Sequence, residues 1–172
     1  TGTLTPVKEE YNAAAGFSII TYEGSVEGGG TDGTDYWDTI PHSLGAKPEM
    51  IIIKNRDEAE SWAVYHKDLT TDYDLALDTS AAQGNNGLFI PSAADHTASL
   101  FTIRADDGMG MEYPRVNGED MFTSTAFNFI AYLFASIPGY SQIGSYVANN
   151  TSGNGPFVYC GFRPALVIVK NI

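Results

Sequence analysis

Short apolar runs recur along the chain and alternate with turns rich in glycine, asparagine and aspartate. Residues 50–53 and 127–134 are apolar at nearly every position, which is typical of strands covered on both faces. Residues 73–78 alternate instead, so we expect Tyr73, Leu75 and Leu77 on a buried face and Asp74, Ala76 and Asp78 on a wet face. Further strands are predicted at 17–22, 36–40, 62–66, 88–90, 100–104, 140–147, 157–160 and 166–169.

No helical period extends beyond a couple of turns. The pattern therefore predicts an all-β fold of about ten to eleven short strands. Strands of this length, separated by turn signals, favour an antiparallel β-sandwich of the jelly-roll or concanavalin-like kind.

The chain contains an internal repeat. Gly45-Ala-Lys-Pro-Glu-Met-Ile-Ile-Ile-Lys-Asn55 returns as Gly161-Phe-Arg-Pro-Ala-Leu-Val-Ile-Val-Lys-Asn171, and Gly16-Phe-Ser18 returns as Gly139-Tyr-Ser141. Matches in the same order indicate a repeated structural unit.

This repeat divides the chain into three parts. We expect a linker over residues 1–15 and a first sandwich unit over residues 16–136. Residues 137–172 are either the start of a second copy or the closing hairpins of the same sandwich. We favour the second copy, because an array of repeats that stops early explains why residues 161–171 end where the next strand would follow.

Charge and cysteine content narrow the function classes. Of 172 residues, 21 are acidic and 9 are basic, which gives a formal net charge of −12. Such a charge repels phosphate backbones and anionic membranes, so we expect no nucleic-acid partner. The sequence also lacks an apolar run long enough for a membrane helix, so no membrane insertion is expected. The single cysteine, Cys160, excludes an internal disulfide.

Candidate glycan-binding residues are aromatic and amide side chains in predicted loops and strand ends. Flat aromatic rings stack on the C–H faces of sugars, and amides hydrogen-bond hydroxyl groups. The candidates are Tyr36, Trp37, Asn85, Asn86 and Tyr113. Packing in the core is the competing interpretation for each aromatic ring.

A weaker candidate is a calcium site. Asp32, Asp35 and Asp38 lie close together but lack the spacing of a calcium-binding loop. Oxygen ligands from separate loops can still bind Ca²⁺, and solvated turns are the alternative. We therefore predict no cofactor and keep Ca²⁺ as an alternative.

No catalytic constellation is evident. His42, His66 and His96 lack metal-ligand spacing, and residues 28–33 match a dinucleotide-binding pattern by letter without the helix that it requires. The sequence therefore predicts a protein that is not an enzyme, although two carboxylates in a cleft could make a glycoside hydrolase.

Several motifs together resemble a known family. They are residues 16–22 (Gly-Phe-Ser-Ile-Ile-Thr-Tyr), 42–56, 62–66 (Trp-Ala-Val-Tyr-His), 131–135 and 155–164. This set is similar to an uncharacterised β-rich repeat domain of virion and tail-fibre-type structural proteins of tailed phages, especially marine ones. Residues 32–38 and 105–120 depart from that resemblance.

The resemblance implies a place on a virion and no catalytic residues. We expect a non-enzymatic structural module of a phage fibre or virion appendage that presents a host-surface glycan-binding face. Its expected partners are further copies of itself in a homo-oligomer, other virion proteins and a host glycan. The alternative is a calcium-assisted carbohydrate-binding module of a bacterial surface or secreted protein.

Overall fold

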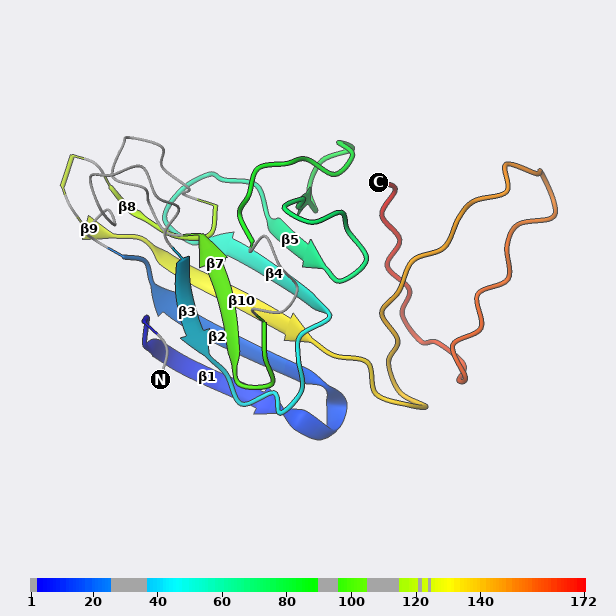
Figure 1. Cartoon of the computed structure of the whole chain (residues 1–172), viewed down its shortest axis with the longest axis horizontal. Coiled ribbons are helices and arrows are strands. Elements are labelled where there is room, and N and C mark those ends of the chain that lie inside the picture. Colours follow the sequence, from blue (N-terminus) through cyan, green and yellow to red (C-terminus); the bar gives the residue numbers. More distant parts are fainter. Residues whose placement is uncertain (1–2, 26–36, 90–95, 105–114, 121, 124) are drawn as a thin grey trace.

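The computed structural model describes residues 3–25, 37–89, 96–104, 115–120, 122–123 and 125–172. In these residues every strand pairing is antiparallel and no α-helix occurs, which confirms an all-β fold with antiparallel sheets (Figure 1). The elements are β1 (Pro6–Asn12), a 3-10 turn (Ala13–Ala15), β2 (Phe17–Glu23), β3 (Trp37–Pro41), β4 (Met50–Asn55), β5 (Ala63–His66), β6 (Leu75–Ala76), β7 (Leu100–Arg104), β8 (Glu119–Asp120), β9 (Thr125–Ala126) and β10 (Asn128–Phe134).

The largest sheet has six strands in the order β1-β2-β10-β4-β5-β6. Strand β10 is central, because Phe134 pairs with Phe17 of β2 on one side and with Met50 of β4 on the other. A strand with neighbours on both edges and apolar residues on both faces is covered in every direction. The apolar run of β10 is therefore the pattern that its position requires.

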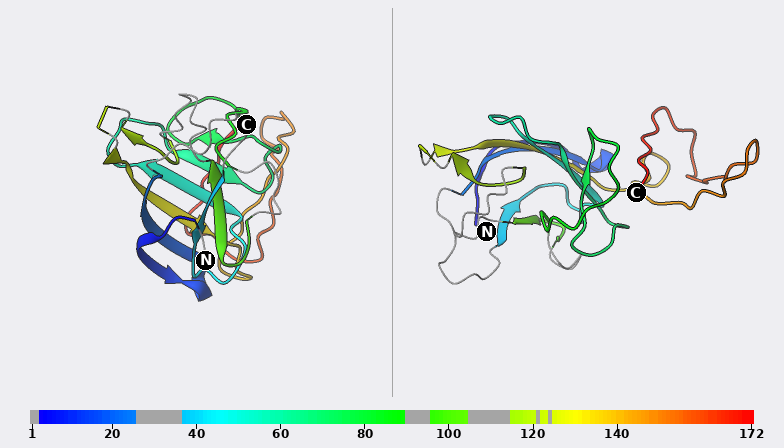
Figure 2. Two further views of the ribbon diagram at one scale, coloured as in Figure 1. Left: turned by 60° about the vertical axis from the view of Figure 1, so that its left-hand side comes forward. Right: turned by 90° about the horizontal axis from the view of Figure 1, so that it is seen from above.

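A second, smaller layer formed by β3 and β7 covers one face of this sheet (Figure 2, right). Between the layers, Tyr22 of β2 stacks on Phe129 of β10 with ring centroids 5.2 Å apart. Phe101 of β7 meets the same tyrosine edge-on at 6.4 Å. The Tyr22 hydroxyl donates to the Val116 carbonyl oxygen at 2.6 Å, which satisfies the one polar atom of this buried ring.

The opposite face of the six-stranded sheet carries a second apolar cluster. Ile52 and Val64 are buried there, and Trp62 stacks on Tyr132 with centroids 6.4 Å apart. Because successive side chains of a strand point to opposite faces, β4 supplies Ile51 and Ile53 to the first core and Ile52 to this cluster.

The expected linker over residues 1–15 is not what the structure shows for Pro6–Asn12, which forms the edge strand β1. Antiparallel pairing with β2 holds this strand, and the Glu9 carboxylate adds hydrogen bonds from the Ser18 hydroxyl at 2.8 Å and the Ser43 amide at 2.7 Å. The strand is mostly polar, as edge strands often are, and this polarity is why its sequence resembles a linker.

The strands predicted at 140–147, 157–160 and 166–169 are not formed. Within residues 137–172 the pairing is a single bridge between Ile137 and Ser141. Both edges of β10, the strand directly before this segment, are already paired with β2 and β4. The segment therefore leaves the sheet and extends away from it (Figure 2, right).

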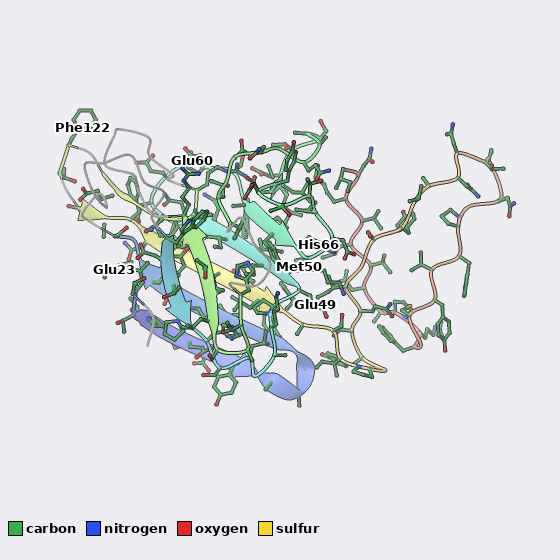
Figure 3. All side chains as sticks on the ribbon, viewed as in Figure 1. Glu23, Glu49, Met50, Glu60, His66 and Phe122 are labelled. Carbon is green, nitrogen blue, oxygen red and sulfur yellow. The ribbon has the colours of Figure 1, made fainter. Side chains whose placement is uncertain are left out.

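Figure 3 places Met50 and His66, which are paired in register, at the end of the sheet from which this segment leaves. Glu23 and Phe122 lie at the opposite end. Of the strand predicted at 88–90, Phe89 makes an isolated bridge to Ile103, and Ile90 is outside the described residues.

Candidate functional site

The best candidate site is a polar cavity of about 350 Å³ beside the short edge strand β6. Alanine and glycine residues leave space in it, and its lining includes five polar side chains. The cavity is lined by Ser61, Asp74, Ala76, Thr79, Ala81, Ala82, Gly84, Asn86 and Arg115.

Asp74 is the central polar group of this cavity. Its backbone is fixed by two reciprocal hydrogen bonds with Gly84, each 2.9 Å long. The residue is 1% exposed. Its Oδ1 accepts from Asn86 Nδ2 at 3.0 Å and from Arg115 Nη1 at 3.4 Å. Its Oδ2 is buried, and no donor in the described part of the chain reaches it.

Arg115 completes the site from a distant part of the chain. Besides Asp74, its guanidinium donates from Nη2 to the Leu75 carbonyl oxygen at 3.4 Å. Its Nε is buried, and no acceptor among the described residues lies within hydrogen-bonding distance. Asp74 Oδ2 and Arg115 Nε both have almost no accessible surface, so neither atom is open to the cavity.

The electrostatics of the site are nearly balanced. Burial raises the pKa of the Asp74 carboxyl above its ordinary value, while the hydrogen bond from Asn86 and the charge of Arg115 act in the opposite direction. The carboxylate and the guanidinium neutralise each other, so the cavity has little net charge to offer an ion. A neutral ligand with both donors and acceptors matches this arrangement best.

Backbone geometry places Asn86 over the carboxylate. Gly87 follows it with a φ of +61°, a conformation that favours glycine. A Cβ added at Gly84 would stand 2.9 Å from Asn86 Nδ2, so the amide packs directly over a residue that has no side chain. The turn cluster over residues 83–87 thus positions the Asn86 amide at the cavity.

The structure brings one of the five predicted glycan-binding residues into this cavity. Asn86 lines it and Asn85 does not, although both side chains are exposed. Trp37 is half-buried, with the Arg104 guanidinium 5.8 Å from its ring centre. Tyr36 and Tyr113 lie outside the described residues.

Asp74 and Arg115 were not predicted as site residues. The alternation of residues 73–78 placed Asp74 on a wet face and Leu77 on a buried one, and this prediction was wrong: Asp74 is 1% exposed and Leu77 is 39% exposed. The residues that follow β6 fold back so that Gly84 pairs with Asp74, and this covers the face expected to be wet. The polar Asn86 two residues beyond that bridge was the available signal.

Of the three aspartates of the candidate calcium site, the structure describes only Asp38. Asp32 and Asp35 lie outside the described residues. Both carboxylate oxygens of Asp38 accept hydrogen bonds, from the Thr3 hydroxyl at 2.7 Å and from Asn117 Nδ2 at 2.8 Å. Among the residues with described placement, no group of three or more His, Cys, Asp or Glu side chains could hold a metal ion.

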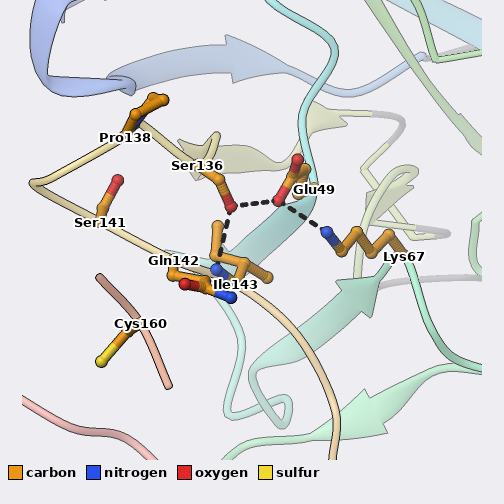
Figure 4. A pocket seen from close by; sticks show the side chains of 8 residues that line it. All are labelled: Glu49, Lys67, Ser136, Pro138, Ser141, Gln142, Ile143 and Cys160. Atoms are coloured by element: carbon orange, nitrogen blue, oxygen red, sulfur yellow. Dashed lines mark hydrogen bonds and ion pairs between the residues drawn. The ribbon is translucent and has the colours of Figure 1, made fainter. Parts of the chain in front are cut away.

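A second cavity of about 310 Å³ lies where the C-terminal segment joins the sheet (Figure 4). Glu49 Oε2 accepts hydrogen bonds from Lys67 Nζ at 3.0 Å and from the Ser136 hydroxyl at 2.5 Å. The Ser136 oxygen in turn accepts from the Ile143 amide at 3.0 Å. These polar groups are bonded to one another, so the cavity is a structural junction between the sheet and the segment.

In the part of the chain that the structure describes, no helix is long and apolar enough to cross a membrane. No curated protein and no solved structure matches the chain. One family model does match it, over residues 2–172, so the C-terminal repeat blocks are part of the pattern that defines the family. The chain therefore belongs to this family, which is described as a domain of unknown function (DUF7483).

Proposed function

We propose that the protein is a non-enzymatic structural module of a bacteriophage fibre or virion appendage, and that it binds a host-surface glycan in the cavity beside β6. The place on a virion rests on the sequence resemblance of residues 16–22, 42–56, 62–66, 131–135 and 155–164 to phage structural repeats. Its partners are then further copies of itself, other virion proteins and the glycan.

We also propose a more specific fold type for the two layers. We assign the two layers to a β-sandwich of jelly-roll or concanavalin-like type. The support is the apolar core that joins Ile20 and Phe129 of the six-stranded sheet to Ile40 and Phe101 of the β3–β7 sheet. Sandwiches of this kind present ligand sites at their edges and loops, where the cavity lies.

One observation supports the proposed binding activity: hydrogen-bonding side chains from separate parts of the chain, Asp74 and Arg115 among them, line one cavity. A sugar hydroxyl donates one hydrogen bond and accepts others, so neighbouring hydroxyls match a lining that contains both acceptors and donors. Asn86 and the hydroxyls of Ser61 and Thr79 add further groups of the same kind. Since the chain has a formal net charge of −12, a neutral glycan is favoured over an anionic one.

The test is glycan binding by the purified protein and by two variants. Asp74→Asn preserves the shape of the side chain but removes the charged acceptor, and we expect it to weaken binding about tenfold or more. Asp68→Asn makes the same charge change at an exposed residue that does not line the cavity, and should leave affinity unchanged.

Equal affinity of the wild-type protein and Asp74→Asn for every bound glycan would show that the cavity is not the binding site. Binding that disappears when calcium is chelated would instead support the calcium-assisted carbohydrate-binding module. Detection of the protein in purified phage particles by mass spectrometry tests the location separately.

A further inference from the structure

The C-terminal repeat blocks retain the local backbone conformation of the first copy. Gly16 and Gly139 have φ angles of +64° and +77°, and Gly45 and Gly161 have φ angles of +74° and +77°. Left-handed backbone at equivalent glycines means that the turns of both copies are built in the same way. The two copies therefore differ in what surrounds them.

In the first copy both blocks are neighbours of one strand, β10. Strand β2 pairs with one edge of β10 and strand β4 with the other. At the end of β10, the Ala135 amide donates to the Gly16 carbonyl oxygen at 2.8 Å. Close contact follows from this pairing, since a Cβ added at Gly16 would lie 2.4 Å from the Ala135 carbonyl oxygen.

In the second copy the same blocks lack such a strand within the part of the chain that the structure describes. Val167 and Val169 are 69% and 63% exposed, whereas their first-copy equivalents, Ile51 and Ile53, are fully buried. A Cβ added at Gly139 would meet nothing within 4 Å. Residues with the composition of a central strand are thus left in solvent.

The segment is attached to the first unit at two places. The Ile143 amide donates to the Ser136 oxygen at the junction shown in Figure 4. Near the other end, Lys170 Nζ donates to the carbonyl oxygens of Thr79 and Ala81, each at 2.8 Å. Two attachments hold the blocks beside the unit and leave their apolar side chains open to a partner.

We propose that residues 139–171 are an acceptor for one added β-strand, and that the donor is a strand of the β10 type from another unit of this family. The donor would lie between residues 139–145 and 166–171, as β10 lies between β2 and β4. It is a strand of about seven residues, apolar on both faces, because residues 139–141 repeat the start of β2 and residues 166–169 repeat the apolar run of β4.

The donor cannot be β10 of a second, fully folded copy. That strand is already paired on both edges and has no backbone groups left to offer. The donor must come from a unit whose own β10 strand still lacks these two neighbours. Such a unit would complete residues 139–171 as β10 completes the first unit, and no apolar strand would then be left exposed. This inference does not depend on glycan binding.

The decisive experiment adds the missing strand to the full chain. Residues 56–136 of the same sequence are appended directly after Asn171, so that residues 139–171 and the appended part together contain one whole unit. Hydrogen exchange is then followed at the amides of residues 166–169. We expect exchange there to slow by about 100-fold or more relative to the 172-residue chain. The matched control carries proline at the appended equivalent of Ala131, in the middle of the donor strand, and should not protect these amides.

A second measurement does not require the longer chain to fold. Val167→Asp in the 172-residue protein should shift the Tm by less than about 2 °C, because the side chain is exposed. Ile51→Asp at the equivalent buried position should prevent folding or lower the Tm strongly. The proposal is overturned if Val167→Asp destabilises the 172-residue protein as Ile51→Asp does, or if the extended chain exchanges at residues 166–169 as fast as the proline control.

Discussion

His96 makes the stability of the fold depend on pH. The ring is 1% exposed, and its Nδ1 accepts a hydrogen bond from the Thr102 amide at 3.2 Å. Burial, with smaller contributions from the positive charges of Lys47 and His42, lowers the pKa of His96 from 6.5 to about 3. Between pH 6.5 and about 3 the folded protein therefore keeps this imidazole neutral, whereas the unfolded chain protonates it.

The sign of the effect follows from proton binding. Between pH 6.5 and about 3 the unfolded chain binds a proton at His96 and the folded protein does not, so stability falls as the pH is lowered through this range. A pH of 5.0 lies about 1.5 units below the pKa of His96 in the unfolded chain. This difference corresponds to about 2 kcal/mol of lost stability. The pKa values of His42 and His66 are also lowered by burial, and they act in the same direction.

The assay is urea denaturation of the wild-type protein and of His96→Asn at pH 7.5 and pH 5.0. The free energies of unfolding are compared where both proteins unfold with the same m-value. Asparagine can accept the Thr102 hydrogen bond and does not titrate. We expect the wild-type free energy of unfolding to fall by about 2 kcal/mol more than that of the variant between the two pH values. An equal fall in both proteins would refute the reasoning, because the acid sensitivity would then arise elsewhere.

Two further matched pairs test the core and the repeat. Phe129→Ala should cost about 3–5 kcal/mol because the ring is fully buried in the main core. Phe157→Ala, at a side chain that is 87% exposed, should change stability by less than about 0.5 kcal/mol. Gly16→Ala should destabilise clearly more than Gly139→Ala: both impose about 1 kcal/mol of left-handed strain, but only the first drives a Cβ into the Ala135 carbonyl oxygen. Chemical denaturation measures all four variants, and a reversed order within either pair would contradict the packing described.

The strands that carry the core were predictable because their residues are apolar on two faces. Residues 50–53 and 127–134 gave the pattern of covered strands, and they became β4 and β10, adjacent in the middle of the large sheet. Strand β1 was not predictable in this way. Its residues are mostly polar, and it is held by antiparallel pairing with β2 and by Glu9, which bonds to residues of β2 and of the turn before β4.

The candidate site could be predicted only in part. Asn86 stood out in a turn cluster, but Asp74 looked like a solvated residue of an alternating strand. Its burial depends on Arg115, a partner 41 residues away in sequence, and on the fold of the loop that returns to Gly84. Periodicity reports which side chains are apolar and contains no information about such distant contacts.

The sequence by itself determined the all-β class and the apolar runs that became the core strands, because these follow from local residue types. Only the tertiary structure decided which runs obtained neighbours. Strands β2 and β4 of the first copy pair with β10, whereas the repeat of the β4 run at residues 166–169 is exposed. A strand needs a partner for its backbone hydrogen bonds, and that partner comes from a distant part of the chain or from another chain.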